Sequence, residues 1–364
     1  MNFKTLSSEG VLFFGDFMAI IDFLKLLFSN FQFCLTVLIT LAVAFVNGWT
    51  DAPNAIASSV ATRCIPMRKA VLFAAFFDLS GALVMGLVSG KVSETVIGIA
   101  DFGADNKAAA VALCAAMCAV VIWATAAWAF GIPTSESHAL LAGIMGASVA
   151  INRSFAEIDF TQWLKVGFGL VISTFMGFFA GFAFSKITVM CFKNTEKSRA
   201  DSVFKRSQIA ASAFMAFMHG AQDSQKFAGI LSLVVALSAN GAGDVSSRVW
   251  PVVLCSLAIA LGTATGGTRI IKSVGMDMIK LRRDQGFSAD MAGAICLLVS
   301  TVFGLPVSTT HTKTCAVLGV GASKSLKSVD WSVAGEMSAA WILTFPGCAL
   351  LGGIITLIFE KVML

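Results

Sequence analysis

Charged residues are scarce in this chain of 364 residues, since Asp, Glu, Lys and Arg together make up 13% of it. A soluble domain averages about 25% charged residues. With 57% hydrophobic residues and a mean hydropathy of +0.84, the chain has too few polar groups to cover its surface in water. The composition excludes a soluble enzyme, a disordered chain and a secreted disulfide scaffold. It predicts an all-α polytopic membrane protein.

Motifs for metal chemistry and hydrolysis are also absent. The nine cysteines form no CxxC pair, and the three histidines form no HxH or HxxxH spacing, which argues against a zinc site. GxSxG and HExxH are missing as well, which argues against a hydrolase. We therefore expect no enzymatic activity and no cofactor. The net charge of +5 comes from short basic clusters between apolar runs, which indicate membrane topology rather than nucleic-acid binding.

Many of the apolar runs are shorter than the roughly 20 residues that a membrane span needs. Gly, Pro or polar clusters interrupt them, as is typical of discontinuous helices in secondary transporters. We expect about 10–12 crossings of the lipid bilayer on this basis. Residues 1–30 form a separate N-terminal segment, in which 11–28 is amphipathic. Two aspartates in it favour a helix at the membrane interface over a span.

Two motifs occur twice in the same order. GWTDAPN, around Asp51, returns as GAQDSQK around Asp223, 172 residues later. PTSESH, which begins at Pro133, returns as PVSTTH at Pro306, 173 residues later. Two motifs at nearly one offset predict an internal duplication.

The charges of the loops give the orientation of the two halves. The loop at 63–69 is basic, whereas its counterpart at 236–244 lacks Lys and Arg. The loop at 264–284 is basic, whereas its counterpart at 91–107 is mildly acidic. Because basic loops stay in the cytoplasm, equivalent loops lie on opposite sides and the repeats are inverted. The predicted divisions are a first repeat at 31–192, a cytoplasmic loop at 193–206 and a second repeat at 207–364.

Asp51 and Asp223 lie inside apolar runs, where a charge costs at least about 2.5 kcal/mol. Carboxylate and amide oxygens, with carbonyls freed at a helix break, suit Na⁺. An alternative is that each aspartate only caps a half-helix. The predicted cation ligands are Thr50, Asp51, Asn54, Gln222 and Asp223.

The two proline motifs place hydroxyl groups at helix starts. Proline suits the first turn of a helix, and free N–H groups with the positive dipole end there attract an anion. Ordinary capping by Ser or Thr is the alternative for these hydroxyls. The predicted oxyanion ligands are Thr134, Ser135, Ser137, Ser308, Thr309, Thr310, Gln222 and Lys226.

Five further ionisable residues are candidates for coupling or gating: Asp78, Glu136, His138, His219 and His311. Lys226 stands where the first repeat has Asn54. A fixed ammonium there either replaces a bound cation or pairs with Asp223.

GWTDAPN and GAQDSQK resemble the paired GxNDxxN-type signatures of the inorganic phosphate transporter (PiT) family, and PTSESH and PVSTTH resemble its hairpins. The resemblance implies a symporter that takes up inorganic phosphate with Na⁺ or H⁺ by alternating access, as a multi-pass protein of the plasma (cytoplasmic, inner) membrane. By this resemblance, the signature Asp and Asn residues of the family correspond to Asp51, Asn54 and Asp223. Four positions depart from the pattern: Thr50, Gln222 and Lys226 stand in place of Asn, and Glu136 in place of a hydroxyl.

Other functions stay open at this point. A permease for sulfate or another oxyanion would share the architecture. An anion channel and an intramembrane hydrolase are weaker alternatives, since a channel needs no duplicated cation site and the hydrolase motifs are missing. The sequence also leaves open whether the protein forms a homodimer.

Overall fold

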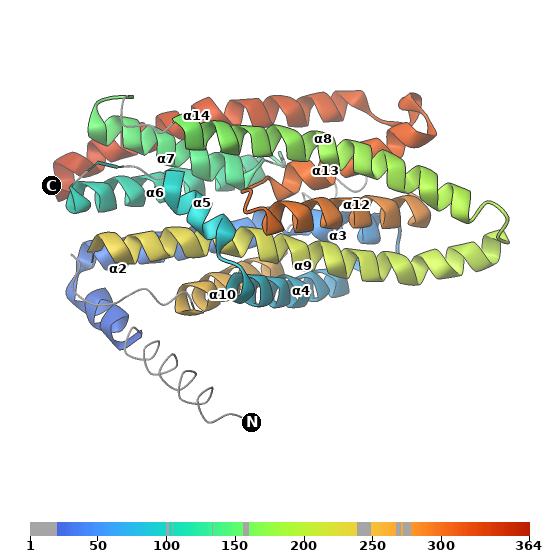
Figure 1. Ribbon diagram of the computed structural model, residues 1–364, viewed down its shortest axis with the longest axis horizontal. Helices are drawn as coiled ribbons and strands as arrows, with labels where there is room; N and C mark the ends of the chain where they lie inside the picture. Colours follow the sequence, from blue (N-terminus) through green and yellow to red (C-terminus); the bar gives the residue numbers. More distant parts are fainter. Residues whose placement is uncertain are drawn as a thin grey trace.

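The computed structural model describes residues 20–99, 102, 103, 105–132, 134–155, 160–238, 249–266, 271 and 278–364. Over these residues the protein is helical, with short connections and no β-strand. The helices form one bundle, in which the long ones lie side by side (Figure 1). They are α2 (Phe31–Thr50), α3 (Pro53–Ala61), α4 (Met67–Val88), α5 (Lys91–Ile99), α6 (Asn106–Ala129), α7 (Glu136–Asn152), α8 (Phe160–Cys191), α9 (Lys197–Ser238), α10 (Val249–Thr265), α12 (Arg283–Val302), α13 (Thr309–Lys324) and α14 (Trp331–Met363).

Polar side chains start several of these helices. The Asn30 side chain accepts a hydrogen bond from the backbone N–H of Phe33 at 3.1 Å, at the start of α2. Asp105 and Asp330 cap α6 and α14 in the same way. Each cap satisfies backbone donors that a helix leaves free. The polar residues between apolar runs therefore fix where the helices begin.

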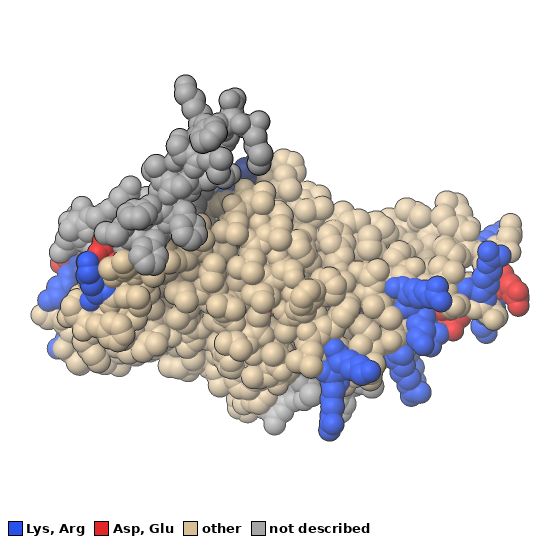
Figure 2. Space-filling model, turned by 90° about the horizontal axis from the view of Figure 1, so that it is seen from below, with Lys and Arg blue, Asp and Glu red and all other residues tan. Residues whose placement is uncertain are grey.

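The surface of the bundle suits a lipid bilayer. Leu72, Phe76, Phe175 and Leu350 are 59–66% exposed. Figure 2 shows a broad surface almost without charges between the two ends of the molecule, where Lys and Arg lie, more of them at one end than at the other. Six helical stretches among the described residues are long and apolar enough to span a membrane: Phe31–Ala61, Met67–Val88, Asn106–Ala129, Val166–Cys191, Arg283–Val302 and Trp331–Met363. The protein is thus a multi-pass membrane protein.

The helices repeat their packing between the two halves. α8 of the first half packs on α13 of the second, and α14 of the second packs on α7 of the first. α4 packs on α9, and α10 packs on α2. α9 begins at the end of the bundle opposite the start of α2 (Figure 1). The two repeats are therefore inverted, as predicted, and each supplies helices to both sides of the molecule.

Small residues allow these paired helices to touch. A Cβ atom on Gly146 would lie 1.9 Å from the carbonyl oxygen of Ala349, where α7 crosses α14. At the equivalent crossing of α13 and α8, a Cβ on Gly319 would lie 1.9 Å from the carbonyl oxygen of Phe178. Only glycine permits such a close approach of two backbones. The repeat thus extends from sequence motifs to individual helix contacts.

The connection between the halves is shorter than predicted. α8 ends at Cys191 and α9 begins at Lys197, so most of the expected loop at 193–206 is helical. Lys, Arg and Ala are strong helix formers, and a helix does not need apolar residues where it extends beyond the bilayer. The segment at 197–206 is therefore helical although it contains no hydrophobic run.

The two aspartate motifs also differ in backbone structure. α2 ends at Thr50 and α3 begins at Pro53, so the chain breaks beside Asp51. α9 continues through Asp223 for a total of 42 residues, although we expected a break there too. Pro53 lacks the N–H that would continue the helix, whereas the equivalent Gln225 has one.

Part of the N-terminal segment lies outside the described residues, which begin at residue 20. Residues 20–29 are helical. Asp22 and Lys25 form an exposed ion pair at 3.0 Å, and Phe28 is 85% exposed. Phe23 instead packs on Trp250 of α10, with ring centroids 4.2 Å apart. The interfacial position of this segment stays a prediction.

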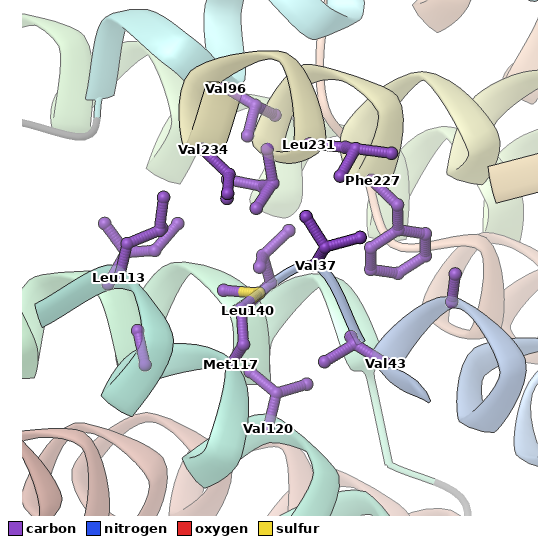
Figure 3. Packing of buried hydrophobic residues seen from close by; sticks show 14 of the residues in the cluster. Val37, Val43, Val96, Leu113, Met117, Val120, Leu140, Phe227, Leu231 and Val234 are labelled. Carbon is purple, nitrogen blue, oxygen red and sulfur yellow. The ribbon is translucent and has the colours of Figure 1, made fainter. Parts of the chain in front are cut away.

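One large apolar core lies among α2, α6, α7 and α9 (Figure 3). Val37, Met117, Leu140 and Phe227 come together there and are all nearly inaccessible. Burying such side chains contributes about 1.5–3 kcal/mol each. The end of the bundle that contains this core is closed by packed hydrocarbon.

Candidate functional site

The two repeat aspartates meet in the middle of the bundle. Asp51 lies at the α2–α3 break and is 2% exposed; Asp223 lies in α9 and is 1% exposed. The hydroxyl oxygen of Thr309 is 3.0 Å from Asp51 Oδ2 and 3.3 Å from Asp223 Oδ2. A hydroxyl has one hydrogen, so it donates to one carboxylate at a time. The shared hydroxyl therefore brings one carboxylate of each repeat to the same point.

The two hairpin motifs converge on these carboxylates. Ser135 starts α7 and accepts a hydrogen bond from His138 N at 3.2 Å; Ser308 starts α13 and accepts one from His311 N at 3.2 Å. These two serines are helix caps, which was the alternative to anion binding. Pro133 lies outside the described residues. The N-termini of two inverted helices thus point into one site.

The hydroxyls in the first turn of these helices reach across the repeats. Thr310 of α13 hydrogen-bonds Asp51, as does Asn54, whose Nδ2 donates to Asp51 Oδ1 at 2.8 Å. Ser137 of α7 accepts a hydrogen bond from Lys226 Nζ at 2.5 Å. Each half-site therefore combines an aspartate of one repeat with a hydroxyl from the hairpin of the other.

The side chains next to the aspartates make different contacts. The Thr50 hydroxyl lies 2.6 Å from Glu136 Oε1. Thr134 and these two residues line a small cavity with Trp128. Gln222 Nε2 donates to the carbonyl of Leu305 at 2.8 Å, at the tip of the second hairpin. Thr50 and Gln222 thus hold the hairpins beside the aspartates.

The three histidines divide into two groups. His219 Nδ1 is 2.8 Å from Asp78 Oδ1, and its Nε2 is 3.4 Å from Asp223 Oδ2. Ligand atoms of Asp51, His219 and Asp223 all lie within 4.8 Å of one another, a spacing that can hold a metal ion. His138 and His311 instead pack on each other. Only His219 touches the acidic cluster, and it gives Asp78 the partner that the sequence did not show.

Sequence reasoning missed a second buried polar cluster. Asp290 of α12 and Lys313 of α13 form an ion pair, and neither side chain is accessible. Asp290 also accepts hydrogen bonds from Gln208 and Ser212 at 2.6 Å each, and from Ser58 at 2.5 Å. The signal was present, because both charges interrupt apolar runs just as Asp51 does.

This second cluster lies between the central site and a cavity. Asn54, Ser58 and Thr62 follow one another at four-residue spacing along α3 and its C-cap, so they share a face. Asn54 contacts the central site, Ser58 the Asp290 cluster, and Thr62 lines a cavity of about 540 Å³. The cavity walls include the basic residues Arg63, Lys193, Lys197, Arg282 and Arg283. Three loops that were predicted to share the cytoplasmic side thus meet there.

Inverted repeats whose helix N-termini and acidic residues meet at the centre of a membrane bundle are typical of transporters. Comparisons with known proteins give the family. A model of the "Phosphate transporter family" matches residues 47–352. The chain therefore belongs to the phosphate transporter family, whose members are permeases rather than enzymes. The predicted family, fold class and absence of enzymatic activity are confirmed.

Individual relatives agree with this assignment. The chain is 35% identical over 331 residues to a probable low-affinity inorganic phosphate transporter of Bacillus subtilis, covering 90% of this chain and 97% of the relative. It is 37% identical over 311 residues to one of Rhizobium meliloti, covering 85% and 91%. A solved structure described as "The sodium-dependent phosphate transporter" superposes with a TM-score of 0.80 at 23% identity, covering 92% of this chain and 100% of that one. The similarity to this solved structure shows the fold.

Proposed function

We propose that this protein is a secondary symporter of the plasma membrane that takes up inorganic phosphate together with Na⁺. The observation that carries the proposal is the joint position of Asp51 and Asp223 beside the N-termini of α7 and α13. The helix ends favour an oxyanion. The carboxylates repel it. The site therefore suits an anion only when cations are present.

The magnitude of this repulsion is large enough for coupling. Two unit charges 4 Å apart interact by about 4 kcal/mol at an effective dielectric constant of 20. A phosphate feels this repulsion from each carboxylate, Lys226 offsets part of it at Asp223, and a bound cation reverses its sign. Phosphate and cation then raise each other's affinity, which is the reciprocal linkage that symport requires. Rocking of one repeat against the other would expose the loaded site to each side in turn.

The ligands favour Na⁺ as the coupling ion. Asp51, Asn54, Thr309 and Thr310 present carboxylate, amide and hydroxyl oxygens at one place, which are hard ligands. The structural neighbour is described as sodium-dependent, which supports the same ion. A proton is the alternative, because His219 and the carboxylates could also carry one.

The phosphate position follows from the helix ends. Ser137, Thr309 and Thr310 lie in the first turns of α7 and α13, where backbone N–H groups are free of helical partners. The site is closed in this structure, since Thr309 and Thr310 are at most 1% exposed. Phosphate would enter between these two helix starts, and Thr134 and Gln222 would border it.

Uptake in proteoliposomes tests the proposal. The purified protein is reconstituted into liposomes, and radiolabelled phosphate is added outside them under a Na⁺ gradient, an H⁺ gradient or neither. Unlabelled sulfate is added as a competitor in parallel. We expect accumulation above equilibrium only with the Na⁺ gradient, and weak competition by sulfate. Equal uptake without any ion gradient would contradict symport. Strong competition by sulfate would contradict phosphate selectivity.

A further inference from the structure

Lys226 holds its charge inside the bundle next to the substrate site. Its side chain is 2% exposed. Its ammonium donates to Ser137 Oγ at 2.5 Å, to Asp223 Oδ1 at 2.6 Å and to the carbonyl oxygen of Val307 at 2.7 Å. An ammonium has three hydrogens, so every donor is used. Lys226 therefore has no donor left for phosphate in this arrangement, although the sequence suggested that it binds the anion.

The three partners of this ammonium form a set of cation ligands. A carboxylate, a hydroxyl and a backbone carbonyl are the oxygen ligands that proteins offer to hard cations. They also come from three separate elements: α9, α7 and the connection before α13. The tethered ammonium thus lies where a free cation would join the hairpins to α9.

The equivalent position in the other half lacks this charge. Asn54 corresponds to Lys226, Asp51 to Asp223 and Thr310 to Ser137. Asn54 Nδ2 lies 2.8 Å from Asp51 Oδ1 and 3.2 Å from Thr310 Oγ1. Asn54 is 3% exposed, yet its Oδ1 has no hydrogen-bond partner. This half-site offers carboxylate and hydroxyl oxygens without a cation of its own, and a flip of the Asn54 amide adds its unpartnered Oδ1 to them.

We propose that Lys226 is a permanent counter-ion in one of two equivalent cation positions, so that each phosphate is transported with one Na⁺ rather than two. The exchangeable Na⁺ binds at Asp51, Asn54 and Thr310. Lys226 neutralises Asp223 in every state and never leaves with the cargo. It therefore lowers the number of ions that drive uptake and the charge moved per phosphate by one. This inference rests on the proposed Na⁺–phosphate symport.

The test replaces Lys226 by the residue of the other half. Lys226→Asn recreates the Asn54 arrangement around Asp223. The Na⁺:phosphate ratio is measured from the gradients at which net phosphate flux in proteoliposomes is zero. We expect a ratio of one for the unmodified protein and two for Lys226→Asn, with a Hill coefficient for Na⁺ that rises in parallel. Lys226→Arg keeps the charge, and the uptake that it retains should stay at a ratio of one.

Binding of radiolabelled Na⁺ to the purified protein covers the case in which Lys226→Asn folds but does not transport. We expect about one saturable Na⁺ per chain for the unmodified protein and two for the variant. A ratio or a binding capacity that is the same in both proteins overturns the proposal, as does a ratio of two in the unmodified protein. If the unmodified protein transports phosphate without Na⁺ coupling, the proposed function itself fails.

Discussion

The imidazole rings of His138 and His311 meet edge to face, with centroids 4.2 Å apart and an angle of 84° between their planes. The two residues are equivalent in the duplication, 173 positions apart. Each lies three residues after the serine that caps its helix. The contact between the rings therefore fixes the two helix starts relative to each other. Trp341 stacks on His311, with ring centroids 3.8 Å apart. This aromatic contact holds both hairpin tips beside the acidic residues.

Asp51→Asn should abolish most of the Na⁺ dependence of phosphate uptake. The amide keeps the shape but loses the charge that attracts the cation. A hydrogen bond to a charged group contributes about 1.5–3 kcal/mol, which corresponds to a roughly 10- to 150-fold change in apparent Na⁺ affinity. Measuring initial uptake against Na⁺ concentration tests this. Asp22→Asn, in the exposed N-terminal helix, serves as the control and should match the unmodified protein.

Thr309→Val should uncouple the two carboxylates. The substitution keeps the shape of the side chain but removes the only hydroxyl that lies within 3.3 Å of both Asp51 and Asp223 in the described structure. Buried carboxylates then lose a donor, at a cost of about 1–3 kcal/mol, and we expect uptake to fall by about tenfold or more.

Thr312→Val is the matched control for Thr309→Val. Thr312 lies on the same helix and is fully buried, but its hydroxyl donates to the backbone oxygen of Ser308 within its own helix, at 2.8 Å. We expect unchanged transport. Equal loss of uptake in both variants would show that Thr309 acts through helix packing rather than through the carboxylates.

The buried pair of Asp290 and Lys313 should be costly to break. Removing one partner leaves an uncompensated charge, which typically destabilises a protein by about 3–5 kcal/mol. Asp290→Asn should therefore lower the unfolding temperature in detergent. At the equivalent positions of the first half, the chain has Met117 and Leu140, both buried in the apolar core (Figure 3).

The double variant Asp290→Met with Lys313→Leu places the apolar residues of the first half at these two positions. Replacing a buried ion pair by packed hydrophobic residues is often neutral or stabilising. We therefore expect the double variant to regain most of the unfolding temperature lost by Asp290→Asn. If instead it is the less stable of the two, the hydrogen bonds from Gln208 and Ser212 to residue 290, which the double variant loses, contribute more than removal of the unpaired charge.

Gly319→Ala should separate α13 from α8. Its Cβ would lie 1.9 Å from the carbonyl oxygen of Phe178, so one backbone must move. Gly335→Ala is the control, because no atom outside its own helix lies within 4 Å of that Cβ. Alanine in a helix is more stable than glycine by about 1 kcal/mol. Thermal unfolding should therefore show a loss for Gly319→Ala and none for Gly335→Ala.

The sequence by itself determined the membrane class, the inverted duplication and most residues of the central site. These follow from local physics: charges cost free energy in lipid, basic loops stay in the cytoplasm, and two motifs recur at one offset. The convergence of PTSESH and PVSTTH followed from the same symmetry. The prediction that each repeat breaks at its aspartate was wrong for Asp223, since no proline interrupts α9.

Tertiary structure alone decided which groups pair across the repeats. The partner of Lys226 could be Asp223, phosphate or both until the positions of Ser137 and Val307 were known. The partner of Asp290, on another helix, and the different roles of the three histidines also depended on long-range packing. Periodicity and motif spacing report what one helix presents to its surroundings. They do not report which distant helix faces it, because that choice is made by the close fit of whole helix surfaces.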